Sequence, residues 1–510
     1  MPIRLVDDEP EEDQPQDDGG RDNSGGGGGG GFPGGGMLSM LLPLLFRYPK
    51  LLILAVVLYG LYYMTSGGCS TPASASEGLS TGMEMKQEVF DKAPVFEPLS
   101  ADMNGKLPES VSLEAYCPKR GNQGGQGSCV GWASAYAART ILQAQATAQN
   151  PNSTIFSPAY VYNQIHLDNC QGSYMNEALK CLGQKGALPL AEFPYNDRDC
   201  SKQPSAAQKD AGAQYRIGGF NRLTDGDNTY GLDINAMKQN LAQGCPVLIG
   251  AMVTSSFQEM RGNRALWRPS SYDQTLGGHA MCVIGYDDTY AGGAFQIMNS
   301  WGEDWGDRGF GWVRYADFKE ITKEAYGLHP LAKPATDGKF DVKIGLVQNK
   351  TKQHIPITLK SSNLFTSAKV GKGTPFKVEV NNSVECYTYV FGMESDNTSY
   401  VLFPYSPKYS AYCGIVGSRL FPKGKSLQPD EVGTQDYMAI VVSKKELNYA
   451  ELNAKVSAAK GTDYLAKFKA ALGSKMAQSV SFKAENGVMH FTATDKDDDA
   501  VVVTVVEVNK

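Results

Sequence analysis

Residues 121–133 read Gly-Asn-Gln-Gly-Gly-Gln-Gly-Ser-Cys-Val-Gly-Trp-Ala, and they place one cysteine, Cys129, at the start of a predicted helix. The residues from Cys129 to Ile141 carry Ala, Tyr and Arg at helical spacing and contain no Pro or Gly after Gly131. A thiol at a helix N-terminus feels the positive end of the helix dipole, which favours the thiolate. Because the thiolate is the nucleophilic form of cysteine, this placement predicts a nucleophile.

An imidazole and an amide follow further along the chain. His279 lies in Gly-Gly-His-Ala-Met and precedes the apolar run 280–286, which predicts a buried strand. Asn299 ends a second apolar run, 295–299, and opens Asn-Ser-Trp-Gly. The spacing is 150 residues from Cys129 to His279 and 20 residues from His279 to Asn299. A thiol, an imidazole and an orienting amide are the parts of a nucleophilic acyl-transfer site.

In this order and spacing, the three residues resemble the papain-like cysteine peptidases, over about residues 107–330. Gln123, six residues before the cysteine, stands where that family places its oxyanion-hole glutamine. The resemblance implies a peptide or protein substrate and needs no cofactor and no metal. It assigns the catalytic roles to Cys129, His279, Asn299 and Gln123.

The resemblance also implies an α+β fold with a helical lobe and a β-barrel-like lobe. The chain agrees, since it predicts helices over 129–149, 157–164, 174–185 and 234–243 and then strands over 246–253, 280–286, 294–299 and 311–315. By the same resemblance, several residues should contact the substrate, some of them around the second residue before the cut. They are Gly172, Ser173, Tyr174, Met175, Gly250, Gly277, Gly278 and Trp301.

Charge along the 510 residues is uneven. The net charge is −6, and the first 36 residues alone hold nine Asp or Glu and two Arg, a net of −7. The remainder is therefore near neutral, which argues against a nucleic-acid partner. Residues 1–36 are acidic and then glycine-rich, so we expect a disordered tail.

Residues 37–68 predict one transmembrane segment. The run 51–64 contains no charged residue, and Arg47 and Lys50 flank its N-terminal side. The positive-inside rule then predicts a single-pass protein of a bacterial inner membrane, with a cytoplasmic N-terminus and a periplasmic catalytic domain. A cleaved signal peptide and lipidation of Cys69 remain alternatives.

Residues 69–105 have little periodicity and predict a linker between the membrane and the domain at 106–333. No long amphipathic helix precedes that domain, so a conventional folded propeptide is not expected.

The chain has ten cysteines, and an exported chain with many cysteines forms disulfides. The resemblance implies that Cys170 and Cys200 hold disulfide positions whose usual partners are missing, and we expect them to pair with each other. Cys386 and Cys413 form a second candidate pair.

Residues 338–510 predict a separate domain, because strands with alternating apolar residues recur between turn signals. Two helices are expected within it, over 445–459 and 463–472. The pattern favours an antiparallel β-sandwich without a catalytic cluster, and hence an accessory domain that binds a substrate or an unknown protein partner.

The leading hypothesis is a membrane-tethered cysteine endopeptidase that acts outside the cytoplasmic membrane. Two alternatives stay open at this point. One is an acyltransferase that uses the same cysteine and histidine. The other is a catalytically silent binding protein in which the β-sandwich does the binding.

Overall fold

The structure, a computed structural model, describes residues 1–8, 80–95, 97–100, 106–223, 231–331, 340–414, 416–495, 497 and 499–510. Within these ranges no helix combines the length and the apolar character that crossing a membrane requires. The predicted transmembrane segment 37–68 lies outside the described residues, as does most of the acidic and glycine-rich tail.

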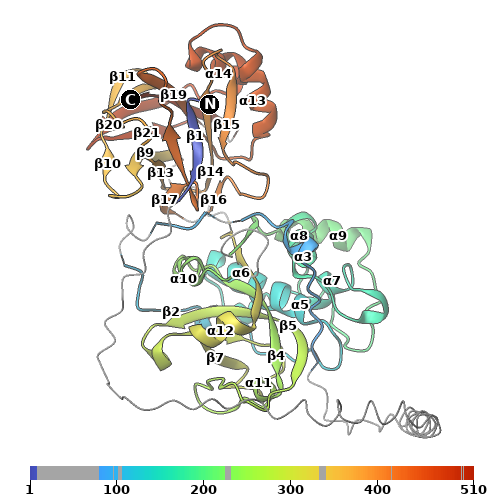
Figure 1. The fold of residues 1–510 in the computed structure, drawn as a ribbon. Coiled ribbons are helices and arrows are strands. Elements are labelled where there is room, and N and C mark those ends of the chain that lie inside the picture. The colour runs from blue at the N-terminus through green and yellow to red at the C-terminus, as the bar shows by residue number, and fades with distance from the viewer. Residues whose placement is uncertain are drawn as a thin grey trace, which may run out of the picture. The chain divides into compact units, whose positions relative to one another are not determined.

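One helix through the core begins at Cys129 (Figure 1). It consists of α5 (Cys129–Gly131), η2 (Trp132–Arg139) and α6 (Thr140–Thr147), and η2 has π-helical hydrogen bonding. Every residue of η2 is buried, as expected for a helix surrounded by other elements on all sides. The other helices of residues 106–331 are α7 (Pro158–Tyr162), α8 (Met175–Gln184), α9 (Ala206–Gly212), α10 (Ile234–Ala242), α11 (Ser255–Gln258) and α12 (Tyr315–Ile321).

A seven-stranded antiparallel sheet forms the other half of this domain. Its strands follow the order β3-β8-β4-β5-β6-β7, and β2 pairs with β5. Their bounds are β2 (Ser110–Ser112), β3 (Phe220–Arg222), β4 (Val247–Thr254), β5 (Thr275–Asp287), β6 (Ala294–Met298), β7 (Phe310–Arg314) and β8 (Thr322–Leu328). His279 lies within β5, and Asn299 directly follows β6, its neighbour in the sheet. The helical part and the sheet therefore carry the predicted thiol and imidazole on different elements, as the sequence predicts.

The predicted linker is part of this fold over residues 80–95 and 97–100. Met83, Phe90, Ala93 and Leu99 belong to the same hydrophobic core as the helices and sheet of residues 106–331, and Phe90 ends a short helix, α3 (Gln87–Phe90). The expectation of an unstructured linker is wrong here, because widely spaced apolar side chains find partners that are distant in sequence.

Two sheets form the C-terminal domain. One has the order β1-β18-β13-β9-β21-β20, with β10 beside β9 and β17 beside β13, and the other has the order β11-β12-β22-β19-β14-β15, with β16 beside β14. The strands are β9 (Phe340–Gln348), β10 (His354–Ile355), β11 (Ile357–Ser361), β12 (Leu364–Ser367), β13 (Phe376–Asn382), β14 (Cys386–Met393), β15 (Ser399–Phe403), β16 (Tyr412–Cys413), β17 (Gly417–Phe421), β18 (Lys425–Pro429), β19 (Gln435–Ser443), β20 (Val480–Glu485), β21 (Val488–Ala493) and β22 (Val501–Asn509).

A hydrophobic core joins the two sheets, and a second apolar cluster includes residues of both helices, α13 (Tyr449–Ala458) and α14 (Tyr464–Leu472). The predicted sandwich and its two helices are present. The prediction of a purely antiparallel arrangement is wrong at one place, since β12 and β22 pair in parallel.

The first strand of the chain, β1 (Ile3–Asp7), belongs to the C-terminal domain (Figure 1, dark blue). Disorder was expected over residues 1–36, and it does not hold for this strand. The acidic average of the tail hides its short apolar pattern of Ile3, Leu5 and Val6.

Candidate active site

Cys129 is fully buried at the first position of α5. The backbone amide of Ala280, the residue after His279, hydrogen-bonds to the Cys129 thiol and favours the thiolate, as do the amides of Val130 and Cys129 itself. Burial outweighs these amides and raises the pKa of Cys129 to about 12. In this covered form the loss of water therefore outweighs the helix N-terminus, and a lowered pKa of Cys129 in the active enzyme stays a prediction.

His279 is held on two sides. Its Nε2 lies 2.8 Å from Oδ1 of Asn299, and its ring stacks on Trp301 with 4.4 Å between the ring centroids and 22° between the planes. Its Nδ1 is buried and has no hydrogen-bond partner among the described residues. Burial lowers the pKa of His279 to about 4, against the smaller opposite effect of Asn299, so the ring is neutral near pH 7. A neutral ring that donates from Nε2 to Asn299 leaves Nδ1 as a base.

Gln123 is held by hydrogen bonds on both sides of its side-chain amide, and one of its N–H groups is bound by the carbonyl of Ser80. Its Oε1 accepts a hydrogen bond of 2.6 Å from Oγ of Ser300, and its backbone carbonyl accepts one of 2.7 Å from Oη of Tyr195. Its Nε2 donates to the carbonyl of Ser80 at 2.9 Å and to that of Gln126 at 3.0 Å. This donor geometry fits the oxyanion role that the resemblance assigns to Gln123.

Residues 80–85, here called the covering segment, lie against most of the predicted substrate contacts. The carbonyl of Ser80 also accepts from Nε1 of Trp301 at 3.0 Å. The carbonyl of Gly278 accepts from the backbone amides of Gly82, at 3.1 Å, and Met83, at 3.0 Å. The chain thus fills its own predicted substrate site.

Ser173 reveals the direction of the covering segment. Its amide donates to the carbonyl of Gly82 at 3.0 Å, and its carbonyl accepts from Glu84 at 3.1 Å, which makes a parallel bridge. Met83 occupies the place assigned to the second residue before the cut, yet it follows Ser80, whose carbonyl contacts Gln123. The covering segment therefore runs opposite to a substrate, and its peptide bonds are not presented for cleavage.

The Met83 side chain lies over Gly250, where a Cβ atom would clash with the thioether at 2.0 Å. Glu324 faces the same site, since its Cβ is 3.6 Å from that position and β8 pairs Glu324 with Gly250. Glu324 is not among the substrate-contacting residues predicted from the sequence. Burial raises its pKa to about 7, while a 2.8 Å hydrogen bond from Oη of Tyr326 partly opposes that effect. Only the pairing of β8 with β4 could have pointed to this residue.

Of the remaining predicted contacts, Gly172 and Gly277 lie against the same segment. A Cβ at Gly172, whose φ is +101°, would lie 2.4 Å from the carbonyl oxygen of Gly82, and one at Gly277 would lie 3.0 Å from Oγ1 of Thr81. Tyr174 is the N-cap of α8, and Met175, its first residue, is fully buried. The structure therefore brings one short segment against seven of the predicted residues, which are Gln123, Gly172, Ser173, Gly250, Gly277, Gly278 and Trp301.

The expected disulfide between Cys170 and Cys200 is present. Cys386 and Cys413 lie opposite each other on β14 and β16, and both are free thiols. Among the described residues, no group of three or more His, Cys, Asp or Glu side chains could hold a metal ion.

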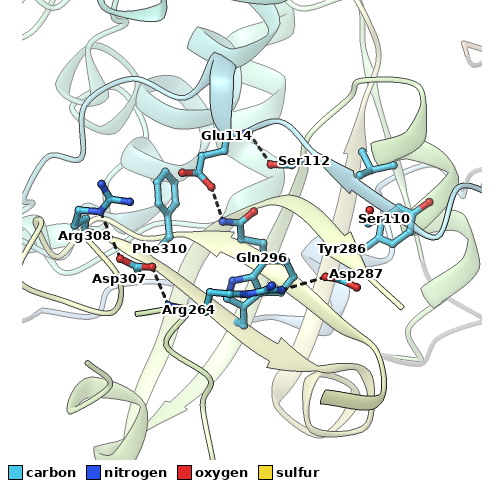
Figure 2. Close-up of a pocket in the computed structure, with 12 residues that line it drawn as sticks. Ser110, Ser112, Glu114, Arg264, Tyr286, Asp287, Gln296, Asp307, Arg308 and Phe310 are labelled. Carbon is cyan, nitrogen blue, oxygen red and sulfur yellow. Dashed lines mark hydrogen bonds and ion pairs between the residues drawn. The ribbon is translucent and has the colours of Figure 1, made fainter. Parts of the chain in front are cut away.

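A separate pocket of about 360 Å³ lies on the sheet and contains none of the predicted site residues (Figure 2). Its charged groups satisfy one another. Arg264 pairs with Asp287 at 3.1 Å, and Nε2 of Gln296 donates to Glu114 at 2.9 Å. This pocket adds nothing to the chemistry of Cys129.

Comparison with known proteins places this geometry in a family. The sequence model described as papain family cysteine protease matches residues 108–328. Cathepsin B-like CP2 of Giardia intestinalis is 28% identical over 232 residues, which is 45% of this chain and 73% of that protein. An uncharacterized peptidase C1-like protein of Acanthamoeba polyphaga mimivirus is 28% identical over 197 residues, covering 37% of this chain and 62% of the relative.

Mouse cathepsin K is 26% identical over 214 residues, 41% of this chain and 60% of its own length. The chain thus spans less than two thirds of the mimivirus and mouse relatives. Among solved structures, xylellain, a cysteine protease from Xylella fastidiosa, matches with 24% identity and a TM-score of 0.42, covering 50% of this chain and 97% of that one. By the family match and these relatives, residues 108–328 are similar in sequence to the papain family of cysteine proteases.

Proposed function

We propose that this protein hydrolyses peptide bonds through Cys129, His279, Asn299 and Gln123. The observation that carries the proposal is the ring of His279, which is fixed by Asn299 and Trp301 and keeps a buried, unpartnered Nδ1. The amide of the next residue, Ala280, contacts the Cys129 thiol. A fixed base whose neighbour in the chain contacts the thiol supports nucleophilic catalysis, which needs the base to take the proton of the thiol.

The proposed reaction takes two steps. Nδ1 of His279 accepts the Cys129 proton, and the sulfur attacks the peptide carbonyl, whose oxygen is bound by Gln123 and the Cys129 amide. The carbon–nitrogen bond breaks as His279 returns the proton to the leaving amine, which leaves a thioester. Water then hydrolyses the thioester, and its proton passes back through His279.

The protein described here is a latent form of that enzyme. The covering segment contacts Gln123, Gly278 and Ser173 and runs opposite to a substrate. The high pKa of Cys129 and the low pKa of His279 both arise from burial, so activity requires displacement of residues 80–85.

We further propose that the protein acts outside the cytoplasm at a membrane. The Cys170–Cys200 disulfide supports an oxidising compartment, and the apolar sequence between residues 37 and 68 supports membrane attachment. A protein partner of the C-terminal domain remains a prediction. Among the described residues, hydrogen bonds join residues 340–510 to earlier parts of the same chain. For example, the amide of Val95 donates to the carbonyl of Lys408 at 2.7 Å.

A silent binding protein would also keep its site covered, so the covering segment alone does not separate that alternative from a latent peptidase. No contact among the described residues favours the acyltransferase alternative. An acyltransferase would transfer the acyl group to an added amine, and analysis of the products would reveal this.

The test uses the full chain with Met83→Asp, which places a carboxylate against Glu324 and weakens closure. An epoxysuccinyl reagent should label this chain at one site, and an unstructured peptide should be cleaved. Adding Cys129→Ala should remove both signals. A folded Met83→Asp chain that neither binds the reagent nor cleaves peptide would support the silent alternative. Cleavage that survives Cys129→Ala would exclude the proposed nucleophile.

A further inference from the structure

The edge of one sheet in the C-terminal domain is covered by the N-terminus of the chain. All five residues of β1 pair antiparallel with β18, from Ile3 opposite Pro429 to Asp7 opposite Lys425. Because β18 has β13 on its other side, it would be the edge strand of this sheet without β1. An uncovered edge strand exposes a row of unpaired backbone groups.

Ile3 anchors the strand through its side chain and backbone. Its side chain is fully buried in the core that joins the two sheets. Its amide donates to Oη of Tyr400 at 3.0 Å, and its carbonyl accepts from the same hydroxyl at 2.8 Å. The backbone groups of Arg4 and Val6 therefore face β18, since those of alternate residues point to opposite sides.

Asp8, directly after β1, binds three groups of the C-terminal domain. Its carboxylate accepts hydrogen bonds from Nζ of Lys377 at 2.8 Å, Oγ of Ser426 at 2.6 Å and Nδ2 of Asn349 at 2.9 Å. The Lys377 side chain is only 7% exposed, so loss of Asp8 would leave a buried ammonium without its carboxylate.

We propose that residues 1–8 are a docking strand for the C-terminal domain, which keeps the N-terminal part of the chain attached after the covalent chain between them is cut. The acceptor is the β18 edge together with Tyr400 and Lys377. Cleavage between residues 9 and 79 would then leave the catalytic domain attached to whatever binds residues 37–68. This inference does not depend on peptidase activity.

The docking strand also constrains topology. Strands that pair within one chain lie on the same side of a membrane, so residues 1–8 and 340–510 share a compartment. This differs from the single-pass orientation expected from Arg47 and Lys50. The uncharged run 51–64 has 14 residues, fewer than the ~20 that a spanning helix needs, which fits attachment from one side.

Retention is tested on the full chain in detergent, with Cys129→Ala to prevent self-cleavage. A site-specific protease sequence is inserted after Ser74, and an affinity tag is inserted in the glycine run 25–31. After complete cutting, capture of the tag should retain residues 75–510. Failure of the unsubstituted strand to retain them would overturn the proposal.

Three substitutions identify the contact responsible. Val6→Pro removes a backbone donor that faces β18, and Asp8→Ala removes the partner of Lys377. Asp8→Ala should reduce the retained fraction by ~10-fold or more, since a lost hydrogen bond to a charged group costs this much. Val6→Pro should also reduce it, because proline cannot donate to the ladder and is not accommodated within a paired strand. Val432→Ala, at a side chain that is 75% exposed and outside these contacts, is the control and should retain residues 75–510 as the unsubstituted strand does. Equal retention by all three would show that another contact holds the fragments.

Topology is tested in sealed right-side-out vesicles with a membrane-impermeant maleimide and Cys69→Ser. Single cysteines are introduced as Ser24→Cys near the docking strand and as Val432→Cys on the C-terminal domain, where Val432 is 75% exposed. The proposal expects both to react, or both to be protected until the vesicles are opened. Reaction at one position and protection at the other would overturn it.

Discussion

At the scale of single residues, burial favours the neutral form of both His279, the proposed base, and Cys129, the proposed nucleophile. Each loses water on burial, which keeps the thiol protonated and the imidazole neutral. Gln123, Cys129, His279 and Asn299 each lie in a short, distinctive run, so the sequence suffices to predict them as a site, and their catalytic roles stay a prediction. The covered state could not, since it depends on contacts with residues 80–85.

Substitution of the proposed base, His279, should lower activity more than substitution of Asn299, which positions its ring. In a Met83→Asp chain, His279→Ala should lower kcat/KM by ~10³-fold or more, because proton transfer is lost. Asn299→Ala should cost less, since Asn299 only orients the ring. Steady-state rates on a fluorogenic peptide measure both. A larger loss for Asn299→Ala than for His279→Ala would contradict the assigned roles.

Glu324 should make substrate preference depend on pH. In the covered protein burial raises the pKa of its carboxyl from the ordinary 4.5 to about 7, so in this form the carboxyl gains charge as the pH rises from 5 to 8. Peptides with Lys at the second residue before the cut should gain over peptides with Met as pH rises from 5 to 8, by ~10-fold. The ratio of kcat/KM values measures this preference. In Glu324→Gln the ratio should no longer change with pH, and an unchanged pH dependence there would exclude Glu324.

At the scale of elements, two short segments escaped the sequence analysis. Residues 80–85 read Ser-Thr-Gly-Met-Glu-Met, which has neither a helical nor a strand period, and they are ordered by contacts with Ser173 and Gly278. Strand β1 is five residues long within an acidic tail, and its partner lies more than 400 residues away. Local pattern carries no information on such distant pairing.

An acidic and a basic substitution at Met83 should have opposite effects on the closure of the covering segment. Met83→Asp places a second acid beside Glu324 and should raise peptide cleavage by the full chain. Met83→Lys places a cation there and should keep the segment closed, because ionised Glu324 can pair with it. Glu84→Ala, at an exposed side chain, is the control and should leave the rate unchanged. Equal activation by Asp and Lys would mean that Glu324 does not face this site.

At the scale of the whole molecule, the catalytic domain and the C-terminal domain have separate hydrophobic cores. The core of the C-terminal domain includes Ile3, so residues 340–510 alone would lack one of its strands. The domain boundaries predicted from sequence are therefore incomplete, because a contiguous segment cannot describe a domain built from both ends of the chain.

A fragment of residues 340–510 should be less stable than the same fragment with residues 1–8 joined to it by a flexible linker. The joined fragment covers the β18 edge, fills the place of Ile3 and pairs Lys377 with Asp8. Its thermal unfolding midpoint should be higher by several degrees. A version with Ile3→Asp should lose most of that gain, and equal midpoints for all three would mean that β1 contributes little to stability.

The pairing of β1 with β18 also affects the order in which parts of the chain can fold during synthesis. A ribosome makes residues 3–7 first, but their partner, residues 425–429, emerges only after the whole catalytic domain has been made. Domains generally fold as units from the N-terminal side during synthesis. Residues 106–331 can therefore fold with the covering segment in place before β18, the partner of the docking strand, has been made. The catalytic domain would therefore be shut before the docking strand binds, and the docking strand could bind only after residues 425–429 have been made.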